Sequence, residues 1–315
     1  MKKSDMEYRN TKRFDKRISK IGFGAWQLGN RKEYESMSEE IGIQLVHKAV
    51  QQGITFFDTA PNYGEGNSEK ILGLALEGTE DEIFINTKVG HTHEGKSDFS
   101  LDGITESIHK SMDNLKRSKL DSVILHNPGR DILEGKEGHY EHLKTLKNEG
   151  LMDGYGVSID TSDELKTVLD HSDVDVIELM FNLIHQSPKV WFDEIEKRGI
   201  LLIIKVPLDS GWLTGKFNSE STFTGIRSRW SVQEIQQRAE LVQEIKDIVE
   251  QDNLVPVALS FILSFEAVNT VIPGIRNEDQ LHSNIDSMNF ELTNDMKEKL
   301  ENLYESKILS LNIPW

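Results

Sequence analysis

The sequence predicts a closed (β/α)8 barrel made by a single domain, residues 1–315. Eight short apolar segments recur along the chain, helical patterns separate them, and about 300 residues hold all eight units. Strict alternation of strand and helix implies a parallel sheet, and this number of units favours a closed barrel over an open doubly wound sheet. No tract rich in Pro, Gly or Ser divides the chain, so we expect one domain.

Each expected strand combines apolar or β-branched residues with turn residues beside it. In the second strand Ile54, Phe56 and Phe57 are apolar, and charge then appears abruptly at Asp58, where Pro61 marks a loop. The eight expected strands are residues 18–25, 54–60, 83–89, 122–127, 154–159, 176–182, 200–206 and 269–275. A barrel carries its active site at the carboxyl ends of the strands. The polar residues expected there are Asp58, Lys88, His126, Ser158, Asn182 and Lys205.

The intervening segments carry helical patterns with start and stop signals. Ser38, Ser68 and Ser162 stand where N-caps belong, and the glycines at 53, 78, 150 and 199 stand where C-caps belong. The expected helices span residues 38–53, 68–78, 104–118, 140–150, 162–171, 187–199, 231–251, 255–265 and 277–288. The longest expected loop, roughly 208–230, follows the seventh strand, and loops of this length usually have a function.

The composition narrows the class of function. A net charge of -17 and a pI near 5.1 disfavour nucleic acid and membrane surfaces as partners. The absence of cysteine excludes disulfides, thiolate metal sites and a cysteine nucleophile. The first residues are basic without an apolar run behind them, so we expect neither a signal peptide nor a membrane anchor. We therefore expect a cytoplasmic enzyme that acts on small molecules.

Asp58, Tyr63, Lys88 and His126 are the candidate catalytic residues. Each alone has an ordinary structural explanation, such as a cap or a packing residue, but all four fall at the same end of neighbouring strands. A tyrosine hydroxyl has a pKa near 10, and a neighbouring ammonium is expected to lower it by roughly 1 to 3 units, into the range useful for general acid catalysis. Asp58 supplies the counter-charge for a buried Lys88, and His126 orients the group that is protonated.

A rival signal lies at residues 90–97, GHTHEGKS, which matches the P-loop pattern from Gly90 to Ser97. In a nucleotide-binding P-loop the helix begins at the Lys-Ser pair, whereas here DFSLDG separates that pair from a helix that starts near Leu101. An ATP or GTP site is therefore the remote alternative. The same loop holds His91 and His93, but no third ligand is evident, so we expect no metal site.

The glycine-rich dinucleotide fingerprint is absent, because Gly22 and Gly24 lack the third glycine. Two other stretches could hold phosphate groups: residues 206–216, VPLDSGWLTGK, and residues 272–284, IPGIRNEDQLHSN. From the residues alone, ordinary turns explain these stretches equally well.

Several of these motifs, taken in order, resemble those of the aldo-keto reductases, from about residue 7 to about residue 305. The matching segments are IGFGAWQLG, FFDTAPNYGEGNSEKILG, NTKVG, LDSVILHNP, YGVS, FNLIHQ, VPLDSGWLTGKF and VIPGIRNEDQLHSN. The resemblance implies the same barrel, with residues 8–20 forming a β-hairpin that closes its bottom. It also implies that Asp58, Tyr63, Lys88 and His126 form a catalytic tetrad.

The resemblance further implies NADPH, more often than NADH, as a cofactor extended across the strand ends. By this analogy Ser158 contacts the carboxamide. Leu208, Ser210, Leu213 and Lys216 line the pyrophosphate, and Gly274, Arg276, Gln280 and Asn284 hold the end with the 2'-phosphate. Other expected cofactor contacts are Trp26, Glu178, Lys205, Pro207 and Gly211. No metal is implied.

Three residues depart from the pattern of the family. Ile159 replaces a common asparagine, Glu178 replaces a glutamine, and Lys205 replaces the aromatic residue that often stacks on nicotinamide. Because Glu178 and Lys205 carry opposite charges at adjacent strand ends, we expect them to form an ion pair.

The resemblance predicts reversible reduction of an aldehyde or ketone, with hydride from the nicotinamide and a proton from Tyr63. Lys88 and Asp58 tune Tyr63, and His126 orients the carbonyl. We expect Trp26, Tyr63, His126 and Trp212 to line the substrate pocket, but the residues identify neither the substrate nor the oligomeric state. The alternative is a cofactor-sensing regulatory subunit of the same fold with little or no turnover.

Overall fold

The eight central strands form a parallel sheet that curls into a barrel. The structure is a computed structural model that describes residues 6–29 and 37–314. The strands, in their spatial order, are β3 (Phe23–Gly24), β4 (Phe56–Asp58), β5 (Phe84–Val89), β6 (Leu120–His126), β7 (Met152–Ile159), β8 (Val176–Met180), β9 (Leu201–Lys205) and β10 (Thr270–Val271). Parallel bridges from Ile21 to Val271 and from Gly24 to Gly274 join the first and last strands. The predicted (β/α)8 barrel is confirmed.

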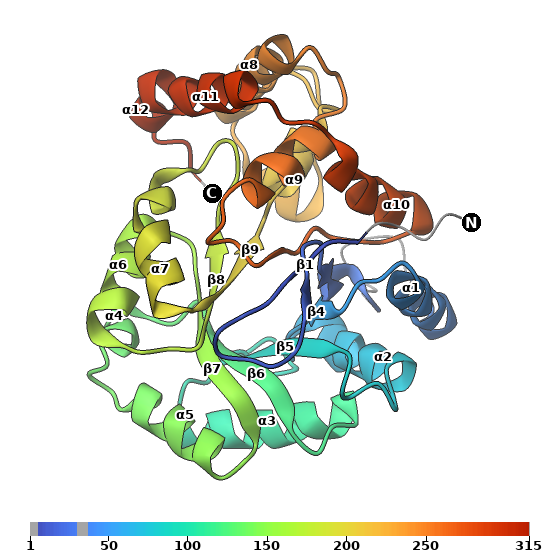
Figure 1. Cartoon of the computed structure of the whole chain (residues 1–315), viewed down its shortest axis with the longest axis vertical. Helices are drawn as coiled ribbons and strands as arrows, with labels where there is room; N and C mark the ends of the chain where they lie inside the picture. Colours follow the sequence, from blue (N-terminus) through green and yellow to red (C-terminus); the bar gives the residue numbers. More distant parts are fainter. Residues whose placement is uncertain (1–5, 30–36, 315) are drawn as a thin grey trace.

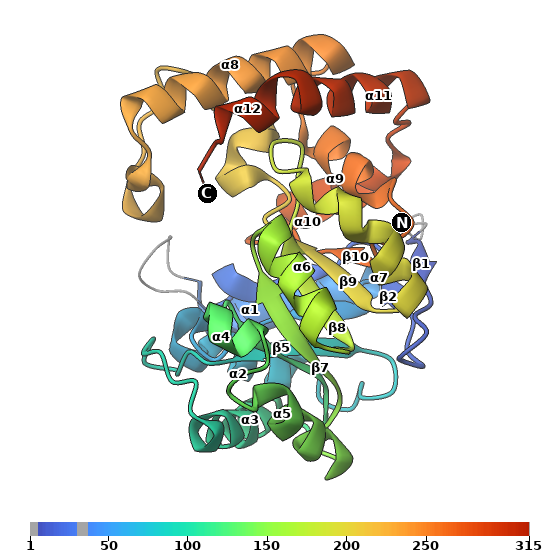
Figure 2. The same ribbon diagram turned by 90° about the vertical axis from the view of Figure 1, so that its left-hand side faces the viewer.

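The helices surround this sheet (Figure 1). They are α1 (Glu39–Gln51), α2 (Asn67–Ala75), α3 (Leu101–Leu115), α4 (Arg130–Leu133), α5 (His139–Asn148), α6 (Ser162–His171), α7 (Phe192–Arg198), α8 (Val232–Val249), α9 (Val255–Leu263), α10 (Glu278–Asp286), α11 (Asn294–Leu303) and α12 (Leu309–Leu311). Short 3-10 turns add η1 (Ala25–Gln27), η2 (Tyr63–Gly66), η3 (Ser187–Trp191), η4 (Asp209–Thr214), η5 (Gly225–Arg229) and η6 (Ser287–Asn289), and η7 (Tyr304–Ile308) is a π-helical turn. Helices α8 and α11 lie side by side at one end of the molecule (Figure 2).

Two of the three predicted N-caps need correction. Ser38 caps α1, because its side chain accepts a hydrogen bond from the Ile41 amide. Ser68 instead lies inside α2, where its hydroxyl donates to the Ala25 carbonyl, and Gly66 is the N-cap. Ser162 is the first residue of α6, whose cap is Thr161 in a capping box.

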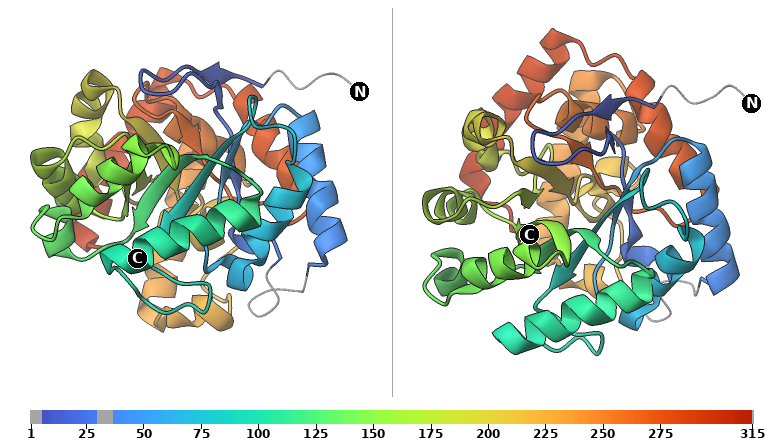
Figure 3. Two further views of the ribbon diagram at one scale, coloured as in Figure 1. Left: turned by 90° about the horizontal axis from the view of Figure 1, so that it is seen from below. Right: turned by 60° about the horizontal axis from the view of Figure 1, so that its bottom comes forward.

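The bottom of the barrel is closed by the expected hairpin, strands β1 (Tyr8–Arg9) and β2 (Ile18–Ser19), which pair in antiparallel fashion. Figure 3 shows this segment in dark blue across the end of the barrel. Its turn carries Phe14, whose ring packs edge-on against Phe84 with the ring centres 5.0 Å apart. The buried apolar cluster inside the barrel consists of Phe14, Ile18, Phe56, Phe84, Ile124, Val176, Leu201, Ile203 and Ile272. The barrel is therefore filled at this end, and space for a ligand remains at the other.

Candidate active site

A cavity of about 1190 Å³ opens at the carboxyl ends of the strands. Asp58 ends β4, His126 ends β6 and Lys205 ends β9, and all three line the cavity together with Tyr63 and Glu178. The volume exceeds the few hundred Å³ typical of a drug-sized ligand. A long ligand with a small molecule beside it therefore fits the space.

Lys88 is the buried cation of the site, and two carboxylates contact it. Its side chain is completely buried, and its Nζ donates to both oxygens of Asp58 at 2.6 Å and to the Thr59 carbonyl at 3.0 Å. It also lies 3.1 Å from Oε2 of Glu178. Burial alone would lower the pKa of Lys88, but the two carboxylates raise it, so the ammonium stays charged.

The two carboxylates that share Lys88 have different pKa shifts. Burial, followed by the negative charge of Glu178, raises the pKa of Asp58 to about 8. Burial also disfavours ionisation of Glu178, but the charges of Lys88 and Lys205 hold its pKa below the ordinary value. Two carboxylates beside one ammonium leave one negative charge in excess, and this excess adds to the effect of burial on the pKa of Asp58.

The expected lowering of the Tyr63 pKa is wrong. Burial raises the pKa of this phenol above its ordinary value, and the charges of Asp58 and Glu178 add to the rise, while Lys88 opposes it. The Lys88 ammonium lies 5.2 Å from the centre of the Tyr63 ring. Lys88 cannot dominate because the effect of burial is larger. Tyr63 consequently keeps its proton at neutral pH, as a proton donor requires.

His126 lies beside Tyr63, with the ring centres 6.0 Å apart and the rings nearly perpendicular. Burial, followed by the charges of Lys88, Lys205 and His91, lowers the pKa of His126 well below its ordinary value. The imidazole is therefore neutral at physiological pH and can donate from one nitrogen. Its Nδ1 is buried without a hydrogen-bond partner among the residues that the structure describes.

The expected ion pair between Glu178 and Lys205 is not formed as a direct contact. Lys205 pairs instead with Asp160, at 2.8 Å, and also donates to the Asn127 side chain at 2.9 Å. Ser158 links the two, because its hydroxyl accepts from Lys205 at 2.8 Å and donates to Oε1 of Glu178 at 3.1 Å. The closer cation for Glu178 is Lys88, which the sequence pattern did not reveal because Lys88 already had Asp58 as its partner.

Most of the residues expected to bind the cofactor line the cavity. These are Trp26, Glu178, Lys205, Pro207, Leu208, Ser210, Gly211, Lys216, Gly274, Arg276, Gln280 and Asn284. Ser158 and Leu213 do not line it, since both are fully buried. The Ser158 hydroxyl is linked to the site through its hydrogen bonds with Glu178 and Lys205.

The assignment of Trp212 to the substrate pocket also needs correction. Trp212 is completely buried and packs against Phe217, Phe223 and Trp230, with ring centres 5.4 to 5.8 Å apart. It anchors the long loop after β9 and does not line the cavity. Trp26 does line the cavity, as expected.

The loop after β9 has an unusual backbone held by a buried ion pair. Val206, Asp209 and Ser210 have positive φ angles between 44° and 55°, a region that side chains other than glycine rarely adopt. Arg238 of α8 donates to Asp209 at 3.2 Å, and both side chains are fully buried. The same guanidinium also donates to the Pro314 carbonyl near the end of the chain.

Sequence reasoning missed two arginines of this loop, Arg227 and Arg229, which line the cavity. Arg229 donates to the Ser210 hydroxyl at 3.2 Å. The sequence contained evidence for them, because the segment IRSR places two positive charges in a loop that was already expected to have a function. With Lys205, Lys216 and Arg276 they place five cations around one cavity of a protein whose net charge is -17.

The P-loop interpretation of residues 90–97 is wrong. His91 and Ser97 form an antiparallel bridge, so the segment folds back on itself, and α3 begins only at Leu101. His93 contacts Glu69 at 3.2 Å and Asn114 at 3.0 Å, while the His91 ring lies against His126 with the centres 5.1 Å apart. No cluster of three potential metal ligands occurs in the described part of the chain.

Comparison with known proteins agrees with this geometry. The model of the Aldo/keto reductase family matches residues 20–305. An uncharacterized oxidoreductase of Bacillus subtilis, YqkF, is 26% identical over 86% of this chain and 88% of its own length. Pyridoxal 4-dehydrogenase of Microbacterium luteolum is 25% identical over 85% of this chain and 89% of its own.

A solved structure shows the same fold. The holo form of aldo-keto reductase AKR11C1 from Bacillus halodurans superposes with a TM-score of 0.79, at 24% identity over 95% of this chain and 96% of that one. Within the described residues, no helix has both the length and the apolar character needed to cross a membrane. The chain belongs to the aldo/keto reductase family and is an oxidoreductase.

Proposed function

We propose that this protein reduces a small aldehyde or ketone to the alcohol, reversibly, with NADPH as the reductant. The observation that carries the proposal is the buried Lys88–Asp58 pair beside Tyr63 and His126 at the floor of a large cavity. A protonated phenol, a neutral imidazole and a buried ammonium at one place suit the transfer of a proton to a carbonyl oxygen.

Each side chain has a distinct part in this chemistry. Tyr63 donates its proton to the carbonyl oxygen, and the ammonium of Lys88 stabilises the phenolate that remains. His126, which is neutral, donates a hydrogen bond that orients the carbonyl next to Tyr63. A reduced nicotinamide cofactor bound in this cavity supplies the hydride. Positioning all groups together removes much of the entropic barrier.

The remainder of the cavity fits a dinucleotide. Lys216, Arg227, Arg229 and Arg276 offer positive charge for phosphate groups. Gly274 lies on the cavity wall, where an added Cβ would meet the Gln27 side chain at 3.2 Å, and the amide Nδ2 of Asn284 is buried without a partner in the described residues. Arg276, just before α10, is the expected contact of the 2'-phosphate that distinguishes NADPH from NADH.

The test begins with fluorescence titrations of NADPH and NADH, followed by the loss of cofactor absorbance with a panel of aldehydes and ketones. We expect tight NADPH binding and consumption with some carbonyl compounds. NADPH binding without consumption on a broad panel would favour the cofactor-sensing alternative.

The choice of cofactor is tested separately with Arg276→Ala. Because the guanidinium contacts only the 2'-phosphate in this proposal, NADPH should bind about tenfold more weakly, which corresponds to about 1.4 kcal/mol. NADH affinity serves as the internal control and should not change. Equal weakening of both cofactors would assign Arg276 a structural role instead.

A further inference from the structure

The floor of the cavity contains a second buried carboxylate next to the Lys88–Asp58 pair. We propose that Glu178 is a positioning residue that shares one proton with Asp58 beside Lys88, so that this carboxyl pair sets the pH at which Tyr63 exchanges its proton. The proposal rests on the proposed function, because it assigns Tyr63 to proton transfer.

The geometry joins the two carboxylates in two ways. Lys88 contacts both, at 2.6 Å to Asp58 and 3.1 Å to Glu178. The side-chain amide of Asn86 also donates to both, at 2.8 Å to Asp58 and 3.4 Å to Glu178. Asn86 is itself fixed by the Ser122 hydroxyl, which donates to its Oδ1 at 2.6 Å. Two carboxylates that converge on the same donors in a buried site cannot both ionise without cost.

The charges around Glu178 leave one proton to be shared. Lys88 neutralises one of the two carboxylates, and Lys205, the other cation that faces Glu178, is already paired with Asp160. The remaining neighbours, Tyr63 and His126, are both neutral at physiological pH. The excess negative charge is therefore offset by a proton, in accord with the raised pKa of Asp58, about 8.

Glu178 also connects this pair to the edge of the site. The second oxygen of Glu178 accepts a hydrogen bond from the Ser158 hydroxyl, and that hydroxyl accepts one from Lys205. Lys205 in turn pairs with Asp160, which is partly exposed. A glutamine at position 178 would keep the hydrogen bond from Ser158 but remove the charge. The expected consequence of the carboxylate is electrostatic, since it raises the pKa of Tyr63 from a distance.

The first experiment is a pH profile of alcohol oxidation in wild-type protein and in Glu178→Gln. Oxidation requires Tyr63 to accept a proton, so it rises with pH as the phenol ionises. Above about pH 8 both carboxyls of the wild-type pair are ionised, so the variant then has one negative charge fewer near Tyr63. The pKa of Tyr63 should therefore fall, and the alkaline part of the profile should move to lower pH by about one unit or more. Glu69→Gln is the matched control, because Glu69 is an equally buried carboxylate that contacts Thr87 and His93 rather than Lys88.

The second experiment does not depend on turnover or on the variant. Carbon NMR of protein labelled at its aspartate and glutamate carboxyl groups should show a carboxyl that titrates near pH 8, the value expected for Asp58. In Glu178→Gln this titration should move to lower pH, whereas in Glu69→Gln it should stay.

The outcomes separate the two proposals. An unshifted profile in Glu178→Gln would overturn the role of Glu178 in setting the pH at which Tyr63 exchanges its proton. A wild-type spectrum in which every carboxyl titrates in the acidic range would overturn the shared proton. Failure to reduce any carbonyl compound would count against the proposed function, while the NMR titration would still decide whether Asp58 and Glu178 share a proton.

Discussion

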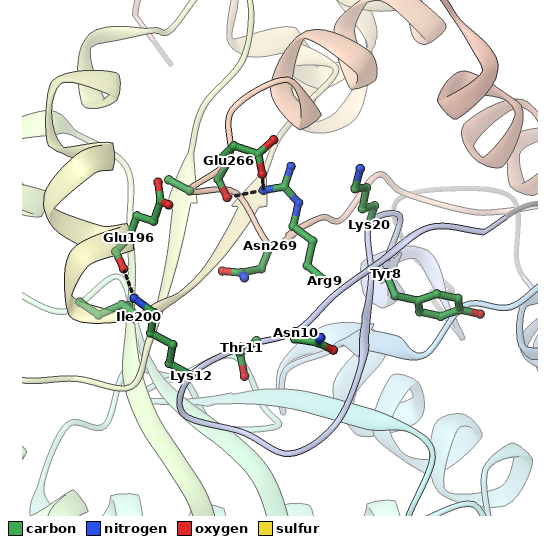
Figure 4. Close-up of a pocket in the computed structure, with 12 residues that line it drawn as sticks. Tyr8, Arg9, Asn10, Thr11, Lys12, Lys20, Glu196, Ile200, Glu266 and Asn269 are labelled. Atoms are coloured by element: carbon green, nitrogen blue, oxygen red, sulfur yellow. Dashed lines mark hydrogen bonds and ion pairs between the residues drawn. The ribbon is translucent and has the colours of Figure 1, made fainter.

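Each end of the barrel carries a cavity, but the polar groups of the two cavities differ in how far their hydrogen bonds are satisfied. The bottom pocket, of about 410 Å³, lies between the hairpin and the start of β9, and two of its basic side chains, Arg9 and Lys12, bind neighbouring residues (Figure 4). Arg9 donates to the carbonyls of Leu263 and Glu266, and Lys12 donates to the carbonyl of Glu196. These contacts hold the hairpin to the barrel.

The top cavity instead buries charges and leaves polar atoms without partners. Lys88, Asp58 and Glu178 are almost entirely inaccessible to water, and buried atoms of His126 and Asn284 lack a partner among the described residues. Positive φ angles also gather here, at Asn127, Val206, Asp209 and Ser210. Such features cost stability and are found where structure serves function. The top cavity therefore differs from the bottom pocket in combining buried charges, polar atoms without a partner and strained backbone at one place.

The largest expected effect is on turnover, which should depend on a tyrosine at the upper end of the barrel and not on one at the bottom. Tyr63→Phe removes the proton donor, so turnover should fall by roughly a hundredfold to ten-thousandfold, the usual contribution of general acid catalysis. NADPH affinity, measured by fluorescence, should stay the same because the ring remains. Tyr8→Phe is the matched change at the bottom, where the hydroxyl donates to the Gly53 carbonyl, and it should leave turnover intact. Turnover of wild-type magnitude in Tyr63→Phe would refute the assignment.

The second expected effect is on the free energy of unfolding, and it compares a buried lysine with an exposed one. Lys88→Met leaves Asp58 and Glu178 without their cation, and the loss of one partner from a buried pair typically costs about 3 to 5 kcal/mol of unfolding free energy. Both carboxylates then favour protonation in the folded state, so the variant should be more stable at acidic than at alkaline pH. Urea unfolding at several pH values measures both effects.

The control for this change is Lys12→Met, at the bottom, where the ammonium contacts only a backbone carbonyl. It should unfold at nearly the wild-type urea concentration at every pH. If Lys88→Met behaved like Lys12→Met, the carboxylates would have to be neutral already, and the account of the site would fail.

The smallest effect concerns the bottom pocket. Arg9→Met removes hydrogen bonds to two carbonyls that follow or end α9, and we expect a loss of about 1 kcal/mol of unfolding free energy. The apolar cluster inside the barrel separates this pocket from the cavity at the carboxyl ends of the strands, so kcat and KM should not change. A clear change in KM for the carbonyl substrate would show that the two ends are coupled.

Sequence reasoning located the strands well because each is short, apolar and closed by a polar residue or a turn. The periodicity also identified α1, α3 and α8. Helix α11 was not expected, since residues 294–303 are mostly polar and bury only Leu300 completely. The cap of α6 was displaced by one residue because Thr161 and Ser162 are both able to accept the required hydrogen bond.

At the site, the residues converge as predicted, but their electrostatics did not follow from sequence. The pKa of Tyr63 depends first on burial and then on the charges around the ring. Neither could be predicted, because the contact of Lys88 with Glu178 comes from β8, which is distant in the chain from β5. Trp212 was misplaced for a similar reason, because only the path of the loop decides whether an aromatic ring faces the cavity or the core.

The bond from Arg238 to Pro314 couples two segments that lie far apart in the sequence. Arg238 also binds Asp209 in the loop after β9, so Pro314 and that loop are held by one guanidinium. Removal of residue 314 would leave this guanidinium with one partner fewer. The loop whose neighbouring residues line the cavity would then be held less firmly, although residue 314 itself does not line the cavity.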